Sequence, residues 1–250
     1  MGILRASLLL AFIAGAAVAA EPGHVEDFTT TLGGWNGGAT ETRVTSGGVG
    51  GASDPYMRVS NSIIVQLAVR NLTAPYVGDL IDDGVGGLSF YLRDVNGTED
   101  LNIYVGVGTQ ANFWRSIVRF HPTAEGWLYG EVDFTDAGAW ELYIGTGTFE
   151  NALRTCDRMQ FRHDHLSGDQ LPSDGVGDFG VDRITILPIA AACSPADLAE
   201  PLGALDFSDV LAFLAAFGSM DPAADLAAPT GVFDFSDVLS FLTAFGGGCP

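Results

Sequence analysis

Short runs of alternating, β-branched and aromatic residues dominate the chain between Glu21 and Pro188. Glycine, aspartate, asparagine and proline cluster between these runs, as in DVNGTED and HPTAEG. Runs separated by such turns predict about ten strands of a single β-sandwich or jelly roll, and no helix of normal length is visible among them. The predicted strands are TRVTS, YMRVS, IIVQLAV, GLSFYLRDV, LNIYVGVG, FWRSIVRF, WLYGEVDF, WELYIG, RMQFRH and GVDRITIL.

A different pattern follows the sandwich region. Residues 196–218 align without gaps to residues 224–246, and both copies contain the phrase DFSDVL before an apolar stretch. Apolar positions at i, i+4 and i+7 predict one amphipathic helix in each copy, and two such helices can bury their stripes against each other. The predicted stripes are Val210, Leu214 and Phe217 in the first copy and Val238, Leu242 and Phe245 in the second.

Both predicted helices have start and stop signals. Asp206 and Asp234 stand where a capping side chain is expected, because an acid there accepts backbone N–H groups and complements the helix dipole. Gly218 and Gly246 stand where a glycine is expected just beyond the helix end. We therefore predict a mainly β protein made of a sandwich over 21–188, a linker over 189–194 and a small all-α domain of two repeats over 195–250.

The first twenty residues have the features of a secretory signal peptide. MGILRASLLLAFIAGAAVAA carries one arginine, then an apolar run, then small residues. We expect cleavage after Ala19 or Ala20 and a secreted, extracellular or cell-surface protein. The apolar run is short for a membrane span, so we expect no transmembrane segment in the mature chain.

Acidic residues far outnumber basic ones. The chain has 31 acids against 11 bases, all of them arginine, and a formal net charge of −20. Such a surface repels nucleic acid and anionic lipid, so we exclude both as partners. It suits calcium. A GC-rich genome would by itself favour arginine over lysine, so the absence of lysine has no functional meaning on its own.

The chain contains three cysteines, and an exported protein permits disulfides. Cys193 and Cys249 bracket the repeated segment, so we predict a disulfide that joins the two ends of the helical domain. Such a bond stabilises a small domain whose core alone is marginal. Cys156 remains, and we expect it to be a buried free thiol because no activating group is visible near it in the sequence.

Acids also recur in the loop before each predicted helix. Calcium loops supply oxygen ligands from alternating loop positions and from the start of the following helix. With the first ligand at Asp197, the later acids are Asp206 and Asp209. In the second copy the corresponding acids are Asp225, Asp234 and Asp237.

This tandem arrangement resembles the dockerin family, in which two calcium-loop-and-helix units form a docking module. The resemblance covers residues 193–250: CSPADL opens the segment, DFSDVLAFLAAFG is repeated as DFSDVLSFLTAFG, and GCP closes it. It implies structural calcium as the cofactor. It also implies a cohesin-like or cell-surface partner that attaches the secreted protein.

The loops depart from the dockerin pattern at two ligand positions each. Alanine and proline stand where the family has asparagine and aspartate, and each loop is one residue longer. Two interpretations therefore stay open: weaker calcium binding through the other acids and carbonyls, or a proline-stiffened loop that replaces the ion. The departing residues are Ala199, Pro201, Ala227 and Pro229.

The sandwich region has a weaker resemblance to carbohydrate-binding modules and galactose-binding-like jelly rolls. It rests on EDFTTTLGGWNGG, on TSGGVGGASDPYMRVSN and on the closing GVDRITIL. In those families the first strand, a glycine-rich loop and an acid on the last strand hold a structural calcium. The matching residues are Glu26, Asp27, Asp54 and Asp182, and ordinary turn acids are the alternative.

A catalytic role has one candidate pair of residues. Glu131 and Asp133 in GEVDF share one face of a predicted strand, and glycoside hydrolysis uses two carboxylates. A solvated strand face is the alternative interpretation. For ligand binding, exposed aromatic rings can stack on sugars, and Tyr104, Trp114 and Tyr129 are the candidates.

The main hypothesis is therefore a secreted, non-catalytic binding module for a polysaccharide, attached through its helical domain. The first alternative is an extracellular polysaccharide hydrolase that uses Glu131 and Asp133. The second is a structural surface protein with neither turnover nor ligand binding.

Overall fold

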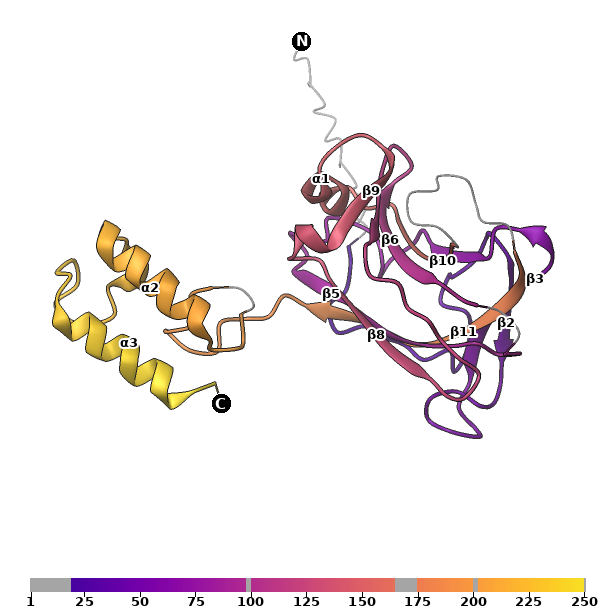
Figure 1. Cartoon of the computed structure of the whole chain (residues 1–250), viewed down its shortest axis with the longest axis horizontal. Helices are drawn as coiled ribbons and strands as arrows, with labels where there is room; N and C mark the ends of the chain where they lie inside the picture. The colour runs from indigo at the N-terminus through magenta and orange to yellow at the C-terminus, as the bar shows by residue number, and fades with distance from the viewer. Residues whose placement is uncertain (1–18, 98–99, 165–174, 200–201, 250) are drawn as a thin grey trace, which may run out of the picture. The chain divides into compact units, whose positions relative to one another are not determined.

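The computed structural model describes residues 19–97, 100–164, 175–199 and 202–249 (Figure 1). The chain divides into two compact units, of which the first ends at Pro188 and the second spans Ile189–Pro250. Among the described residues, no helix has the length and apolar character needed to cross a bilayer.

The first unit contains two antiparallel sheets. The first sheet has the strand order β2-β3-β11-β5-β8, and the short strand β1 pairs with β11. Its long closing strand β11 lies between β3 and β5, so the end of this unit is held on both sides. The strands are β1 (Val25–Glu26), β2 (Thr40–Val44), β3 (Tyr56–Val65), β5 (Val85–Arg93), β8 (Leu128–Asp133) and β11 (Gly175–Pro188).

The second sheet has the order β4-β10-β6-β7-β9. Its strands are also antiparallel throughout the described part. The 3-10 turn η1 (Ala137–Ala139) precedes β9, and the short helix α1 (Phe149–Arg154) follows it. The strands are β4 (Ala68–Asn71), β6 (Ile103–Thr109), β7 (Asn112–Ser116), β9 (Trp140–Gly145) and β10 (Arg158–His163).

One continuous core joins the two sheets. Leu88 and Phe90 of β5 contribute to it from the first sheet, and Val105 of β6 and Phe161 of β10 contribute from the second. Alternate residues of a strand point to opposite faces, so each sheet has one face in this core and one outer face. The mainly β architecture with two antiparallel sheets is therefore confirmed.

Each of the ten predicted strand runs contains at least part of a strand. Four local features differ from the prediction. IIVQLAV is divided between the end of β3 and the start of β4, and only the first part of FWRSIVRF lies in β7. The two-residue strand β1 and the six-residue helix α1 were not predicted, because both are too short to produce a periodic pattern.

The second unit contains the helices α2 (Phe207–Ser219) and α3 (Phe235–Gly247), with the 3-10 turn η2 (Pro222–Ala224) between them. Asp206 and Asp234 cap these helices, as predicted, and each forms a capping box with the acid three residues later. Phe213 of α2 stacks on Phe241 of α3 with ring centroids 4.2 Å apart. This stack forms the centre of a small separate core.

Two details of the helix prediction were wrong. Leu214 and Leu242 are 57% and 54% exposed, because Phe213 and Phe241 take the buried positions instead. Gly218 and Gly246 lie inside the last helical turn, since Met220 and Gly248 occupy the C-cap positions. The left-handed conformation of Met220 (φ 56°) shows that no glycine was required there.

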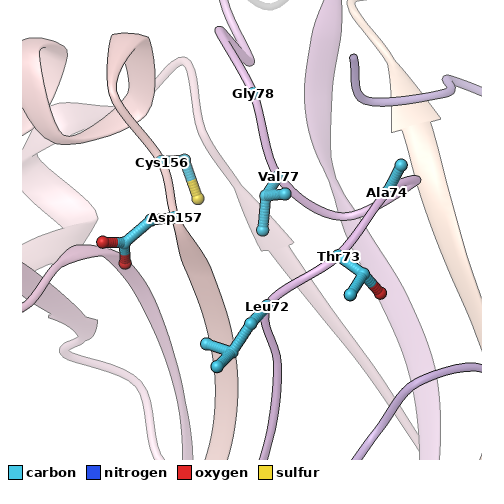
Figure 2. A pocket seen from close by; sticks show the side chains of 7 residues that line it. All are labelled: Leu72, Thr73, Ala74, Val77, Gly78, Cys156 and Asp157. Carbon is cyan, nitrogen blue, oxygen red and sulfur yellow. The ribbon is translucent and has the colours of Figure 1, made fainter. Parts of the chain in front are cut away.

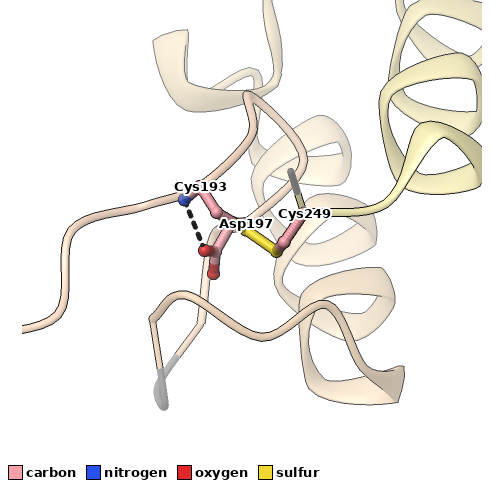
Figure 3. Close-up of side chains that lie close together, drawn as sticks. All are labelled: Cys193, Asp197 and Cys249. Atoms are coloured by element: carbon pink, nitrogen blue, oxygen red, sulfur yellow. Dashed lines mark hydrogen bonds between the residues drawn. A yellow bond between two sulfur atoms is a disulfide. The ribbon is translucent and has the colours of Figure 1, made fainter.

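A disulfide joins Cys193 to Cys249, as predicted (Figure 3). It connects residues 56 positions apart, with their Cα atoms 5.3 Å apart. The Cys193 backbone N–H donates to Asp197 Oδ2 at 2.8 Å, so the start of the first loop is fixed beside the disulfide.

Candidate functional site

Aromatic side chains lie on the outer face of the first sheet, and Tyr129 of strand β8 is the most exposed of them. Tyr129 is 50% exposed, and its ring lies edge-on to that of Tyr91 on β5 with centroids 5.4 Å apart. The Tyr129 hydroxyl donates a hydrogen bond to the Glu131 carboxylate, and this bond raises the pKa of Tyr129. The rings of Tyr56, Tyr91, Trp127 and Tyr129 are called the outer aromatic row below.

The other half of the row packs on a glycine. A Cβ atom at Gly180 would lie 3.0 Å from Trp127 and 3.1 Å from Tyr56, so these rings lie closer to strand β11 than an ordinary Cβ contact allows and would shift by a few tenths of an ångström if Gly180 were alanine. Trp127 and Tyr56 meet edge-to-face at 5.2 Å, and the Trp127 indole N–H donates to the Gly47 carbonyl at 3.2 Å. These contacts fix the orientation of the half-buried Trp127 ring.

The three predicted ligand-binding aromatics lie in three different environments. Tyr129 belongs to the outer aromatic row. Trp114 is half-buried, its indole N–H donates to Asn112 Oδ1 at 2.9 Å, and its ring packs against Phe149. Tyr104 is fully buried on the outer side of the second sheet, and burial raises its pKa. Tyr129 is therefore the most exposed of the three.

The predicted acid pair lies on the exposed edge strand β8. Glu131 accepts the Tyr129 hydroxyl, and Asp133 Oδ1 accepts the backbone N–H and hydroxyl of Thr135 at 2.6 and 2.7 Å. Both acids line a hollow of about 80 Å³ with Trp140. Ligand pockets usually measure about 300–1,000 Å³, so this hollow does not enclose a sugar ring.

A larger pocket of about 390 Å³ lies between residues 72–78 and Cys156 (Figure 2). Its lining is mostly apolar. The Cys156 thiol donates to the Arg158 carbonyl, and burial raises the pKa of the thiol to about 12. Cys156 is therefore a buried free thiol, as predicted, and it stays protonated at neutral pH.

The four acids predicted to bind calcium in the sandwich separate into different environments. Asp54 and Asp182 face the same glycine-rich loop, since a Cβ at Gly48 would lie 2.8 and 2.7 Å from their Oδ2 atoms. The Glu26 carboxylate instead fills the space beside Gly33 that a Cβ atom would occupy. Asp27 Oδ1 accepts hydrogen bonds from the backbone N–H and the hydroxyl of Thr29. Within the described ranges, these acids do not form a cluster of three whose oxygens lie within 4.8 Å of one another.

Asp182 is the most constrained of these acids. It is fully buried, and its two oxygens accept the backbone N–H groups of Val49 and Arg183, each at 2.8 Å. Burial outweighs these hydrogen bonds, and with the nearby Asp54 it raises the pKa of Asp182 to about 6. A cation beside Asp54 and Asp182 would compensate the two charges.

This environment predicts a pH dependence of sandwich stability. The folded-state pKa of Asp182 lies above its unfolded value, so its contribution is complete at low pH and is lost as the pH rises through about 6. We expect a loss on the order of 1–3 kcal/mol of unfolding free energy between pH 4 and pH 7. Denaturant unfolding at each pH measures it.

The control for this prediction is a pair of variants. Asp182→Asn should flatten the profile between pH 4 and pH 7, whereas Asp136→Asn, at an exposed capping position, should leave it unchanged. Parallel profiles for the natural protein and Asp182→Asn would show that Asp182 does not titrate in this window.

In the helical unit, the acid at the end of each loop binds backbone N–H groups. Asp209 Oδ1 accepts from Leu198 and Ala199, and its Oδ2 accepts from Asp206, at 2.8–2.9 Å. Burial would raise the pKa of Asp209, but these three bonds outweigh it and hold the pKa below its usual value. Asp237 repeats the same three bonds in the second loop, and its pKa is also lowered.

The acid at the start of each loop has one oxygen without a partner. Asp197 Oδ2 accepts from Cys193 and Gly203, and Asp225 Oδ2 accepts from Gly231. In contrast, Asp197 Oδ1 and Asp225 Oδ1 are both buried and accept no hydrogen bond. A buried carboxylate oxygen without a partner is costly, so these two atoms are the ones in the loops that fit a cation.

Comparisons with known proteins give structural matches only. No family model matches the chain, and no curated protein matches it. A family 11 carbohydrate-binding module from Clostridium thermocellum, solved with a β-1,3-1,4-mixed-linked tetrasaccharide, is 15% identical with a TM-score of 0.45, over 68% of this chain and 97% of that chain. A CBM22-1 xylan-binding domain from Paenibacillus barcinonensis Xyn10C is 13% identical with a TM-score of 0.41, over 69% and 99% of the two chains.

Proposed function

We propose that the sandwich is a non-catalytic carbohydrate-binding module of a secreted protein and that the helical unit attaches it to a scaffold or cell surface. The observation that carries the binding function is the outer aromatic row with its exposed Tyr129 ring. Aromatic faces pack against the apolar C–H face of a sugar ring, while polar groups beside them bind hydroxyls. Glu131, hydrogen-bonded to Tyr129, supplies such a polar group.

Substitutions at Tyr129 test this assignment. Tyr129→Ala removes the exposed ring, and we expect it to weaken polysaccharide binding by about tenfold, the upper end of a single aromatic contact. Tyr129→Phe keeps the ring and should retain most of the affinity. The measurement is affinity electrophoresis of the mature chain in gels that contain soluble polysaccharides. Unchanged mobility shifts for Tyr129→Ala would place the sugar elsewhere.

The hydrolase alternative has a separate test. Release of reducing ends from a polysaccharide that is lost in Glu131→Gln would support catalysis by Glu131 and Asp133. Retention on the polysaccharide without release supports binding. The structural-protein alternative predicts neither effect.

Attachment rests on a second pair of apolar stripes on the helices. Phe207 and Phe235, the first residues of α2 and α3, are each 70% exposed. Leucines follow at i+4 and i+7 of each helix, so each helix presents an exposed apolar face, and such faces are typical of protein-binding surfaces. The exposed leucines are Leu211, Leu214, Leu239 and Leu242.

The negative charge of the helical unit limits which partner surfaces can bind these apolar stripes. Residues 189–250 contain eight acids and no base, so two copies of the unit repel each other. A cohesin-like or cell-surface partner should therefore present an apolar face bordered by arginine or lysine. Binding to such a face would weaken as salt increases, because salt screens the attraction.

Calcium is the proposed structural cofactor of the helical loops. Asp197 Oδ1 and Asp225 Oδ1 would hold one ion each, together with carbonyl groups and water. Asp209 and Asp237 already satisfy three backbone N–H groups each, which leaves few charged ligands. Sites with few carboxylates bind calcium weakly, at about 0.1–1 mM as in extracellular modules.

Calorimetric titration of calcium into the mature chain tests this assignment. We expect saturable calcium binding. The double substitution of Asp197→Asn and Asp225→Asn should abolish the part of this binding that belongs to the helical unit. Asp221→Asn, at the exposed cap of η2, is the matched control and should bind as the natural protein does. Equal binding by the double variant would mean that the backbone N–H groups have replaced the ion in these loops.

A further inference from the structure

Backbone hydrogen bonds tie the first described residues to the body of the sandwich. The backbone N–H of Ala20 donates to Asp83 Oδ2 at 2.7 Å. The backbone N–H of Glu21 donates to the Pro75 carbonyl at 3.1 Å. Strand β1 then pairs with β11 a few residues later. The chain is therefore fixed in place from the nitrogen of Ala20 onward.

The side chains change from exposed to buried at the same point. Ala19 is exposed, whereas Ala20 is only 6% exposed and belongs to the core of the sandwich. Cleavage after Ala20 would remove a buried methyl group together with the N–H group that Asp83 accepts. Cleavage after Ala19 would keep both.

The sequence before Ala20 favours the same peptide bond. Signal peptidases cleave after two small residues that are separated by one position, an A-x-A pattern. Ala17, Val18 and Ala19 provide this pattern for cleavage before Ala20, whereas cleavage after Ala20 would place Val18 at the first small position. One observation from the sequence and one from the fold therefore select the bond between Ala19 and Ala20.

We propose that a signal peptidase hydrolyses the Ala19–Ala20 bond and that the new α-ammonium group of Ala20 forms an ion pair with Asp83. The inference rests on the proposed secretion of the protein. Water adds a hydroxyl group to the Ala19 carbonyl carbon and a proton to the Ala20 nitrogen as the C–N bond breaks. At neutral pH the new carboxyl group releases a proton and the new amine takes one up. The Ala20 nitrogen then donates a charge-assisted hydrogen bond, which is about twice as strong as a neutral one.

The surroundings of Asp83 favour a positive charge at this nitrogen. Asp79 and Asp82 belong to the same turn as Asp83, and both pair with Arg154, at 3.6 and 2.9 Å. A charged Ala20 nitrogen would bring a second cation to this acidic turn. Asp83 is half-buried, so salt screens its attraction less than that of an exposed acid. Because the nitrogen is a neutral amide before cleavage, the ion pair belongs to the processed chain alone.

N-terminal sequencing and intact mass of the exported protein test the cleavage site. We expect a chain that starts AEPGHVEDF, with Ala20 first. An exported chain that starts at Glu21, or at any other residue, would overturn the inference and leave the proposed secretion standing. A chain that stays in the cells and keeps Met1 would contradict secretion as well.

The ion pair has a separate test, because the chain contains no lysine and the α-amine is the only primary amine of the mature protein. The probe is the N-hydroxysuccinimide ester of acetic acid at pH 7. We expect Asp83→Asn to accelerate acetylation of this amine by about tenfold, because only the neutral amine reacts and Asp83 keeps it charged. Asp82→Asn is the matched control and should leave the rate unchanged, since Asp82 pairs with Arg154. Equal rates for the natural protein and Asp83→Asn would overturn the ion pair.

The melting temperature of the acetylated protein gives a second measurement that needs no substitution. Acetylation of the natural protein should lower the melting temperature of the sandwich by about 2–4 °C, the effect of losing one partly buried ion pair in a domain of this size. The same treatment should not change the melting temperature of Asp83→Asn, where the pair is already absent. Equal decreases in both proteins would mean that the α-ammonium group does not act through Asp83, which contradicts the proposal.

Discussion

Replacement of Cys193 and Cys249 by serine will unfold most of the helical unit at 37 °C. The disulfide closes a loop of 56 residues, and removing such a loop constraint costs about 4 kcal/mol in the chain-entropy model. A domain of this size has a core too small to supply much more than that. The expected result is a large loss of helical circular dichroism at 222 nm in the double variant.

The third cysteine provides the control. Cys156→Ser changes a cysteine of the other unit and should leave the helical signal unchanged. A double variant that keeps its helices at 37 °C would show that the Phe213–Phe241 core is sufficient without the disulfide.

Truncation of the central ring in the helical unit is the second change with a large expected effect. Phe213 is 2% exposed and stacks on Phe241 with ring planes 13° apart. Phe213→Ala leaves a cavity at the centre of this small core, and such truncations cost about 3–5 kcal/mol. Thermal unfolding followed by circular dichroism at 222 nm measures the loss.

Leu214→Ala is the matched control on the same helix. Leu214 is 57% exposed, so its truncation should change the free energy of unfolding by less than about 0.5 kcal/mol. If both variants lost the same free energy of unfolding, the assignment of the Phe213 side of α2 to the core would be contradicted.

The sequence identified the helices but not their buried side. The phrase DFSDVLAFLAAF has apolar residues on nearly every face, so the stripe through Leu214 and the stripe through Phe213 both satisfy a helical period. Only the position of the second helix selects between them. The caps were predictable because capping is local: Asp206 accepts a hydrogen bond from the backbone N–H of Ser208, two residues away.

The strands were predictable from alternation, yet the functional surfaces were only partly so. In GLSFYLRDV the buried Leu88, Phe90 and Leu92 alternate with outward residues, so the outward position of Tyr91 could have been read from the sequence. Tyr104 also alternates with core residues but is itself buried, which alternation does not reveal. Arg115 of β7, Arg119 of the following loop and Tyr143 of β9 contact its ring, and such long-range contacts have no signature in the sequence.

The acids of the sandwich illustrate the same difference. Asp54 and Asp182 are far apart in the chain and meet only because the loop around Gly48 folds over strand β11. Glu26 matched the same family pattern, but its side chain turns beneath Gly33. A pattern of residue types therefore identified possible ligands, and backbone geometry decided which of them face each other.

The most direct test of the proposed function is depletion of the mature chain from solution by a panel of neutral and uronate-containing polysaccharides, with reducing ends measured in the same samples. We expect saturable depletion by at least one polysaccharide without release of reducing ends, and loss of that depletion in Tyr129→Ala. No depletion by any polysaccharide, or release of reducing ends that disappears in Glu131→Gln, would contradict a non-catalytic carbohydrate-binding module.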